Sequence, residues 1–190
     1  MSAELEDGLS LRLCPVPHST MPAYLDRIDR DTPGQRDDVS PLFADGTAFT
    51  ALIDDLGQRC DHLGYDAIAG IDALGFVLGA ALARRACRGL IVVRKAGSLP
   101  VAALRESFVD YTGTQKALEL RADLVPVGAR VLIVDEWVET GAQANAAARL
   151  VERAGGCVVG IATIQADASP GARALGAQYP LVALTGDLGR

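Results

Sequence analysis

The sequence lacks the features that would place the chain in a membrane or outside the cell. No uncharged apolar run approaches the roughly 18 residues of a membrane span, although hydrophobic residues make up 49% of the chain. The start, MSAELEDGLSLRLCPVP, has acidic residues and prolines where a signal peptide has a basic end and an unbroken apolar stretch. We therefore expect a cytoplasmic protein with no membrane partner.

Paired cysteines and an excess of basic residues are also missing. The four cysteines (Cys14, Cys60, Cys87 and Cys157) are widely scattered, which favours reduced thiols over a disulfide framework or a metal site. A net charge of −6 gives no electrostatic footprint for DNA or RNA, because such binding neutralises many phosphates with Lys and Arg. We expect no nucleic-acid partner, whereas locally placed cations, Mg²⁺ and helix N-termini still allow a small polyanion to bind.

The apolar residues are patterned as in an α/β protein. Apolar runs without alternation, which are typical of strands covered on both faces, occur along the chain between segments of helical periodicity. We expect strands at 65–69, 89–94, 117–122, 131–134, 157–164 and 181–184, helices at 45–63, 76–87 and 141–154, and a mobile loop over 95–115. The sequence predicts a doubly wound parallel sheet of about five strands.

One core is expected, because 190 residues are ample for a single α/β domain and short for two. The sequence shows no internal repeat, low-complexity tract or linker. We predict an accessory hood region over residues 1–45, an α/β core over 46–165 and a C-terminal extension over 166–190.

The segment Val131 to Gln143 is the most informative part of the chain. Its apolar strand ends in two carboxylates, Asp135 and Glu136, and a small-residue turn then opens an Ala-rich helix. Ligands of open α/β sheets bind at the carboxyl ends of the strands, and the first N–H groups of a helix are free to hold a phosphate. The segment therefore predicts a sugar-phosphate site, although two acids after a strand also occur in plain loops and helix caps.

Three further blocks, Asp38 to Pro41, Gly70 to Leu82 and Val93 to Pro100, precede this segment in the chain. In their order and spacing the four blocks resemble the type I phosphoribosyltransferases, in particular the adenine phosphoribosyltransferase branch. The resemblance implies the doubly wound fold of that family with a small N-terminal hood. It also implies an Mg²⁺-dependent enzyme that works as a homodimer and transfers 5-phosphoribosyl from its pyrophosphate to a heterocyclic base.

The resemblance also implies roles for individual residues. Asp135 and Glu136 are expected to stabilise positive charge on the ribose ring, near Mg²⁺ held mainly by the pyrophosphate and ribose of the substrate. Asp110 and Tyr111 match a lid pair that assists proton transfer and covers the site. The other expected binding residues are Asp72, Arg94 and Lys95 for pyrophosphate, Glu139, Thr140, Gly141, Ala142 and Gln143 for the 5′-phosphate, and Arg36, Asp38 and Val39 for the base.

The chain departs from the family pattern where that pattern places two cations. Leu74 and Ser98 replace them. A charge-assisted contact is worth on the order of 1.5–3 kcal/mol, so their loss weakens pyrophosphate binding unless another cation compensates. Lys116 and Arg105 are the candidates for this compensation.

Other departures concern the base and the 5′-phosphate. Arg36 stands where the family has an aromatic ring that stacks on adenine, and a guanidinium can also stack on a ring. Gln143 replaces a threonine, and Glu139 has to direct its charge away from a bound phosphate. Trp137 either stacks on a ligand or fills a gap beside the helix.

Three functions fit these observations. The leading one is phosphoribosyl transfer to a purine-like or related nitrogen heterocycle, as in purine salvage, which yields a nucleoside 5′-monophosphate and pyrophosphate. A second is a non-catalytic regulator that binds phosphoribosyl pyrophosphate or a nucleotide with the same fold. A third is transfer to an unusual heterocycle in a specialised pathway.

Overall fold

The structure is a computed structural model that describes residues 22–34 and 36–186. Within this part, seven strands form one sheet: β1 (Ala67–Ile71), β2 (Gly89–Lys95), β3 (Leu104–Val109), β4 (Gln115–Leu120), β5 (Arg130–Val138), β6 (Cys157–Ala166) and β7 (Leu181–Thr185). Their order across the sheet is β3-β4-β2-β1-β5-β6-β7. The five strands from β2 to β7 in this order are parallel, whereas β3 and β4 form an antiparallel hairpin at one edge.

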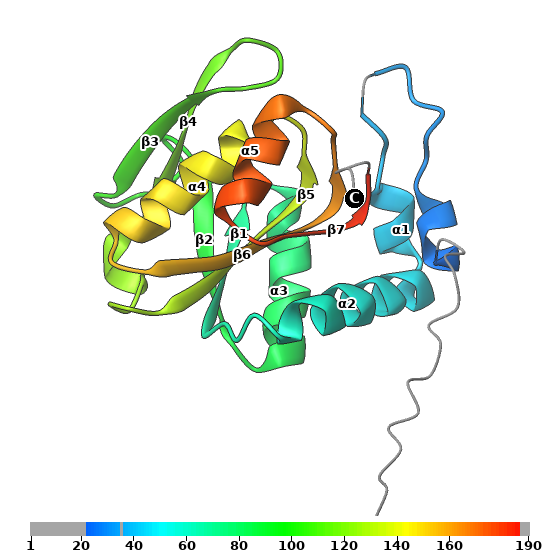
Figure 1. Cartoon of the computed structure of the whole chain (residues 1–190), viewed down its shortest axis with the longest axis horizontal. Helices are drawn as coiled ribbons and strands as arrows, with labels where there is room; N and C mark the ends of the chain where they lie inside the picture. Colours follow the sequence, from blue (N-terminus) through cyan, green and yellow to red (C-terminus); the bar gives the residue numbers. More distant parts are fainter. Residues whose placement is uncertain (1–21, 35, 187–190) are drawn as a thin grey trace, which may run out of the picture.

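Helices cover both faces of the sheet. α2 (Gly46–Asp61) and α3 (Leu74–Ala86) pack on one face, and α4 (Ala142–Arg153) and α5 (Pro170–Gln178) pack on the other. The short helices η1 (Ala23–Arg27) and α1 (Ser40–Ala44) lie beside α2, far from the β3–β4 hairpin (Figure 1). A further short helix, η2 (Ala122–Leu124), follows β4. This arrangement confirms the predicted α/β fold class.

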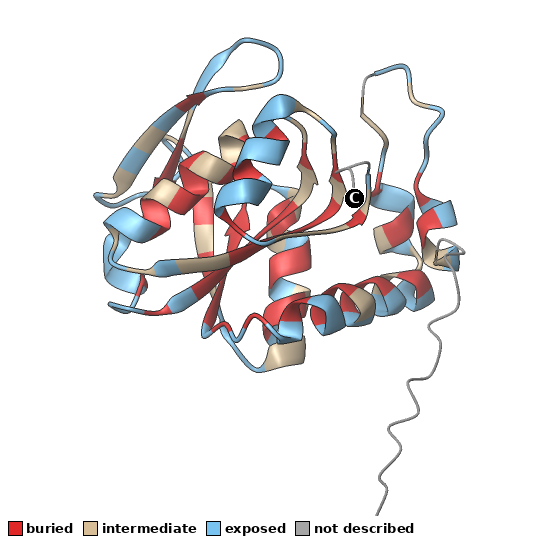
Figure 2. Ribbon diagram, viewed as in Figure 1, coloured by how far each residue is buried: buried red, intermediate tan, exposed pale blue. Residues whose placement is uncertain are grey.

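Apolar side chains form two clusters, one on each face of the sheet. Along β5, Val131 and Ile133 belong to the cluster under α4, and Leu132 and Val134 belong to the cluster under α3. All four are fully buried, and Figure 2 shows burial concentrated in the central strands and on the inner sides of the helices. The lack of alternation in the β5 sequence therefore reflects a strand covered on both faces.

The structure describes the hood from residue 22 onward, apart from residue 35. Asp29 and Asp38 form an isolated antiparallel bridge, and the apolar side chains of Leu25, Ile28 and Leu42 pack against α2. Asp45 caps α2 because its carboxylate accepts from the N–H groups of Thr47 and Ala48, each at 3.1 Å. The expectations for the first 20 residues and Cys14 lie outside the described residues.

Two local expectations need correction. Residues 104–109 are strand β3 and not part of a mobile loop, and the sheet has seven strands where about five were expected. The alternation in β3 is concealed, because Glu106 occupies an inward position between Leu104 and Phe108, where it accepts from Arg149 of α4 at 2.7 Å. α5 was not predicted, although Ser169 caps it by accepting from the N–H of Ala172 at 3.1 Å.

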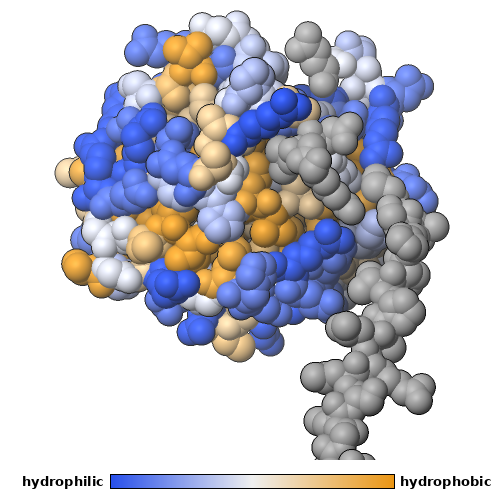
Figure 3. Space-filling model, in the orientation of Figure 1, coloured by the Kyte–Doolittle hydropathy of each residue, from blue (hydrophilic) through white to orange (hydrophobic). Residues whose placement is uncertain are grey.

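The division of the chain into hood, core and C-terminal extension stays a prediction, although β7 of the last part forms an edge strand of the sheet and α5 packs on the sheet. Apolar side chains also reach the surface over the middle of the face viewed in Figure 3, where β6 and β7 run in Figure 1. Among the described residues, no helix is both long enough and apolar enough to cross a membrane.

Candidate active site

A cavity of about 230 Å³ opens at the carboxyl ends of the parallel strands. Its wall contains Asp72 after β1, Lys95 at the end of β2, and the segment 136–141 from the end of β5 onward. The β3–β4 hairpin and Arg36 of the hood close the remaining sides. The cavity lies at the edge of the sheet where open α/β proteins bind ligands.

The connection from β5 to α4 and the first two residues of α4, together residues 139–143, form a small loop that we call the phosphate loop. Gly141 adopts a positive φ of 76°, which favours glycine, and the Thr140 hydroxyl accepts from the N–H of Ala142 at 3.3 Å. The start of α5 supports the loop from outside, because the Ser169 hydroxyl donates to the carbonyl of Glu139 at 2.5 Å. The first N–H groups of α4 have no carbonyl one turn earlier in the helix, so the loop suits an anion.

The connection from β1 to α3 lies against the end of β5. Asp72 accepts from the Nε of Arg94 at 3.2 Å, so Arg94 neutralises a carboxylate of the cavity wall. A Cβ atom on Gly75 would stand 2.5 Å from the carbonyl oxygen of Val134 and 3.2 Å from the Cα of Asp135. Glycine at this position therefore allows the two connections to approach each other.

The two acids of β5 lie in different environments. Glu136 lines the cavity, whereas Asp135 is buried below its wall and accepts from the Nε2 of Gln143 at 2.8 Å. Asp135 is only 2% exposed and does not line the cavity, although it lies within the same strand as Glu136, Trp137 and Val138, which do. The structure therefore directs only one of the two predicted carboxylates at the cavity.

Burial raises the pKa of Asp135 well above its usual range, and the neighbouring Glu136 carboxylate raises it further. Burial disfavours the charged form of an acid, and a like charge has the same effect. Asp135 therefore holds its proton to a higher pH than an ordinary aspartate does.

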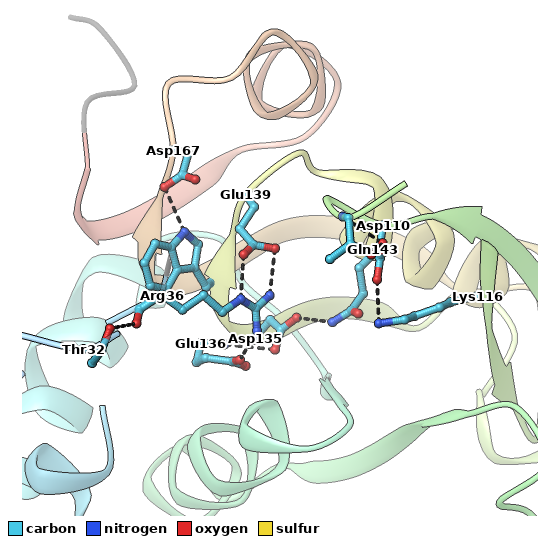
Figure 4. Close-up of polar contacts among 11 residues, drawn as sticks. Thr32, Arg36, Asp110, Lys116, Asp135, Glu136, Glu139, Gln143 and Asp167 are labelled. Carbon is cyan, nitrogen blue, oxygen red and sulfur yellow. Dashed lines mark hydrogen bonds and ion pairs between the residues drawn. The ribbon is translucent and has the colours of Figure 1, made fainter. Parts of the chain in front are cut away.

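Arg36 bridges the hood and the phosphate loop (Figure 4). Its Nε and Nη2 atoms donate to the two carboxylate oxygens of Glu139 at 2.6 and 2.7 Å, and its Nη1 lies 3.6 Å from Glu136 Oε1. The guanidinium carbon lies 4.9 Å from the ring centroid of Tyr111, within cation–π range. Hydrogen bonding to Glu139 raises the pKa of Arg36, so the residue stays charged, and the charge of Glu139 is directed at Arg36.

Asp110 begins the turn of the β3–β4 hairpin. Its Oδ1 accepts from the N–H groups of Thr112 at 2.9 Å and Thr114 at 3.0 Å, and its Oδ2 lies 2.5 Å from the Nζ of Lys116. The Lys116 ammonium and then the Thr112 hydroxyl hold the pKa of Asp110 well below its usual range. Asp110 is therefore an anion at neutral pH, able to accept a hydrogen bond from a ring N–H but not to donate a proton.

Trp137 also lines the cavity, and its indole Nε1 donates to Asp167 Oδ1 at 2.8 Å. Asp167 directly follows β6, so the neighbouring strand fixes the orientation of the indole. The contact with Asp167 is visible in Figure 4. Three planar groups therefore line the cavity: the Trp137 indole, the Tyr111 ring and the Arg36 guanidinium.

Comparisons with known proteins agree with this geometry. The sequence profile of the phosphoribosyl transferase domain matches residues 44–175. The chain belongs to the phosphoribosyltransferase family. The adenine phosphoribosyltransferase of Kineococcus radiotolerans is 41% identical over 170 residues, which cover 89% of this chain and 91% of that protein. The similarity supports the adenine branch of this enzyme family and so confirms the prediction of a phosphoribosyltransferase.

Solved structures of the family have the same fold. The adenine phosphoribosyltransferase of Thermoanaerobacter pseudethanolicus superposes with a TM-score of 0.80 at 31% identity, over 88% of this chain and 99% of that chain. The Saccharomyces cerevisiae enzyme, solved with an imino-altritol bisphosphate and adenine, gives a TM-score of 0.69 at 27% identity, over 79% and 86% of the two chains.

The structure brings most of the residues predicted from the family together on the cavity wall. These are Arg36, Asp72, Lys95, Asp110, Tyr111, Glu136, Glu139, Thr140, Gly141 and Gln143. Asp135, Arg94 and Ala142 lie just behind this wall, next to residues that form it. Lys116, one of the two candidate compensating cations, lines the cavity, whereas Arg105 does not.

Two predicted base-binding residues lie elsewhere. Val39 is buried in the apolar cluster that also contains Leu25 and Ile28, and the Asp38 carboxylate accepts from the N–H of Ser40 at 2.8 Å at the start of α1. Of the predicted base-binding residues, only Arg36 reaches the cavity. α1 begins directly after Val39, with proline at its second position, so Val39 packs in the apolar cluster of the hood and Asp38 accepts from the first N–H of the helix.

Proposed function

We propose that the chain catalyses Mg²⁺-dependent transfer of 5-phosphoribosyl from phosphoribosyl pyrophosphate to a ring nitrogen of a purine-like heterocycle. The products are a nucleoside 5′-monophosphate and pyrophosphate. Adenine is the acceptor in the names of the relatives and is the first base to test. The observation that carries the proposal is the meeting of the phosphate loop, Glu136 and Lys95 around one cavity.

The phosphate loop fits the 5′-phosphate. Thr140 offers a hydroxyl, and the start of α4 offers backbone N–H groups and the positive end of the helix dipole. The Glu139 carboxylate is paired with Arg36, which offsets its charge beside a bound phosphate. Lys95 lines the cavity together with Asp72, at the ends of β2 and β1, and would bind the pyrophosphate group.

Glu136 supports the chemical step. During transfer the bond from the ribose C1 to the pyrophosphate oxygen breaks, a bond from C1 to the ring nitrogen forms, and positive charge builds on the ribose. A carboxylate beside the ring stabilises that charge electrostatically. The acceptor nitrogen loses its proton, and the Asp110 carboxylate on the cavity wall is placed to accept a hydrogen bond from that N–H before the proton passes to water.

Mg²⁺ fits this site as an ion held chiefly by the substrate. The described residues contain no group of three or more His, Cys, Asp or Glu side chains arranged around a metal position. Mg²⁺ commonly binds through one or two carboxylates together with substrate phosphates and water, and Glu136 is a carboxylate of the cavity wall. When bound, the ion would neutralise charge on the pyrophosphate as it leaves. The homodimer and the cytoplasmic location stay predictions.

One observation favours the second function, a regulator that binds without turnover. Leu74 and Ser98 bring no charge to the pyrophosphate region, and Arg36 is already paired with two glutamates. A site with fewer available cations binds the same anion more weakly and stabilises the leaving pyrophosphate less.

The test is incubation of the pure protein with phosphoribosyl pyrophosphate, Mg²⁺ and adenine, hypoxanthine, guanine or other heterocycles, with nucleotides separated by chromatography. We expect a nucleotide from at least one base, and Glu136→Gln should lower kcat about a hundredfold. Asp123→Asn, which alters an exposed surface acid, is the matched control. Calorimetric binding of phosphoribosyl pyrophosphate with no nucleotide from any base would favour the regulator instead.

A further inference from the structure

The chain has only two lysines among its 18 basic residues, Lys95 and Lys116, and both line the candidate active site. Every other basic residue is an arginine. The two lysines come from different elements, since Lys95 ends β2 and Lys116 is the second residue of β4. The ammonium group of lysine is a compact charge on a flexible stem, so it can follow an anion that an arginine fork fits less well.

Lys116 is paired with a carboxylate that the fold holds in place. The Asp110 side chain is only 7% exposed and accepts from the N–H groups of Thr112 and Thr114 in its own turn. The Lys116 side chain is 49% exposed, and its Nζ lies 2.5 Å from Asp110 Oδ2 (Figure 4). Of the two partners, Asp110 is fixed and Lys116 is free to turn toward the cavity.

The two arginines nearest the cavity are either paired with more than one carboxylate or lie behind the wall. Arg36 makes a bidentate contact with Glu139 and a longer one with Glu136. Arg94 is paired with Asp72. Lys95 and Lys116 are therefore the cations of the wall with the fewest carboxylate partners, while pyrophosphate brings several negative charges.

We propose that Lys116 binds the pyrophosphate group of the substrate, exchanging its contact with Asp110 for one with a phosphate oxygen. This inference rests on the proposed function and assigns the compensation for Leu74 and Ser98 to one residue. The exchange also frees Asp110 Oδ2, which then faces the cavity without a cation. Asp110 thus competes with pyrophosphate for Lys116, and this competition gives the two residues opposite effects on binding.

Calorimetric titration with inorganic pyrophosphate and Mg²⁺ tests the competition. Lys116→Gln should weaken binding about tenfold or more, as expected for the loss of a charge-assisted contact. Asp110→Asn keeps an oxygen that accepts from Thr112 and Thr114 but removes the competing charge, so it should strengthen binding about twofold to fivefold. Lys116→Arg should retain part of the affinity.

Arg121→Gln is the matched control, because it removes an ion-paired cation directly after β4 that does not line the cavity. It should leave pyrophosphate binding unchanged. Thermal unfolding of each variant checks that the hairpin still folds. Equal weakening by Lys116→Gln and Arg121→Gln would overturn the proposal, because the effect would then depend on overall charge.

Chemical labelling gives a readout that needs no variant. The protein is treated briefly with an amine-reactive acetylating reagent, and the labelled lysines are quantified by mass spectrometry. Pyrophosphate with Mg²⁺ should lower acetylation of both Lys95 and Lys116, whereas inorganic sulfate at equal ionic strength should protect neither. Protection of Lys95 alone would overturn the role of Lys116 and leave the proposed function standing. Absence of any pyrophosphate binding to the unmodified protein would instead count against the proposed function.

Discussion

The two sides of the candidate active site are held together by different forces. On one side, which we call the loop side, the phosphate loop, the β1–α3 connection and the start of α5 meet through backbone groups and glycines. On the other, the hood side, Arg36, Tyr111, Asp110 and Lys116 meet through ion pairs and a cation–π contact between partly exposed side chains. Backbone contacts tolerate few substitutions, whereas ion pairs can be exchanged in matched pairs.

The difference corresponds to parts of the proposed substrate, with the ribose 5-phosphate at the loop side and the acceptor base, together with the pyrophosphate contact proposed for Lys116, at the hood side. The ribose 5-phosphate part is common to all phosphoribosyl transfer, and the loop side that fits it follows the family pattern apart from Glu139, Ala142 and Gln143. The acceptor varies, and the hood side carries Arg36 in place of an aromatic ring. The comparison predicts that substitutions on the loop side strongly destabilise the fold, whereas substitutions on the hood side cost less and can be offset by a second substitution.

The largest effect is expected at Gly75. In Gly75→Ala the new methyl group would overlap the Val134 carbonyl, and overpacking of this kind costs about 1–3 kcal/mol. We expect the midpoint of thermal unfolding to fall by about 5–10 °C, as a cost of ~2–3 kcal/mol implies for this chain length. Gly46→Ala is the control, because nothing lies within 4 Å of the position that its methyl group would take, and it should not destabilise. Equal unfolding temperatures for both variants would remove the distinction between the two sides.

A smaller effect is expected at the Arg36–Glu139 pair. Arg36→Met leaves two carboxylates, Glu136 and Glu139, without their shared cation, and Arg36 is 40% exposed, so solvent limits the cost to about 1 kcal/mol. Glu139→Gln in the same chain should restore most of the loss. Urea unfolding of the two single variants and the double variant measures the coupling. Additive losses in this cycle would show that the pair does not act as a unit.

Substitution of Asp135 should change the stability of the fold by an amount that depends on pH. Its pKa is raised in the folded chain, so its contribution to stability is complete below its ordinary value of 3.8 and is lost as the pH rises through the folded value. Asp135→Asn keeps an oxygen for Gln143 and cannot ionise. The variant should unfold at the same or a higher temperature than the parent at pH 8, by about 2–4 °C for ~1 kcal/mol. At pH 4 the two should converge, and a variant less stable at pH 8 would contradict the raised pKa of Asp135.

The smallest effect is expected from substituting Trp137, which is the only tryptophan of the chain and so its only indole fluorophore. Because its indole lines the cavity, binding of an acceptor base should change its fluorescence. Trp137→Phe should abolish this signal, keep an aromatic ring and weaken base binding by no more than about tenfold. Titration with adenine and hypoxanthine measures the change, and pyrophosphate alone serves as the control ligand. A fluorescence unaffected by every base would place the base away from Trp137.

The sequence predicts the loop side well because local patterns specify it. The unbroken apolar run of β5 identifies a central strand, and Gly141 directly before α4 identifies the turn that starts a helix. The length of β5 was not predicted, since nothing in the pattern shows that the strand continues past its acids to Val138. The fold buries Asp135 and leaves Glu136 on the cavity wall, so the local pattern pairs two acids that end in different environments.

The hood side was predicted less well because it depends on contacts between distant segments. Arg36 and Glu139 are 103 positions apart, and no local sequence pattern indicates that they form a pair. The requirement that Glu139 direct its charge away from a phosphate was predicted, but its partner was not. Asp38 and Val39 were placed by analogy, whereas the apolar packing of the hood determines their position.

The contact between Arg36 and Glu139 also has a consequence for the order of events during synthesis and folding. The hood is made early, but its partner in the phosphate loop is made 103 residues later, and Ser169 and Gly171, which support that loop, are made later still. Contacts across such long separations form late because closing a long loop costs chain entropy. The first part of the candidate site to be synthesised is therefore among the last to be completed, and the phosphate loop lacks its contacts with Ser169 and Gly171 until α5 has emerged.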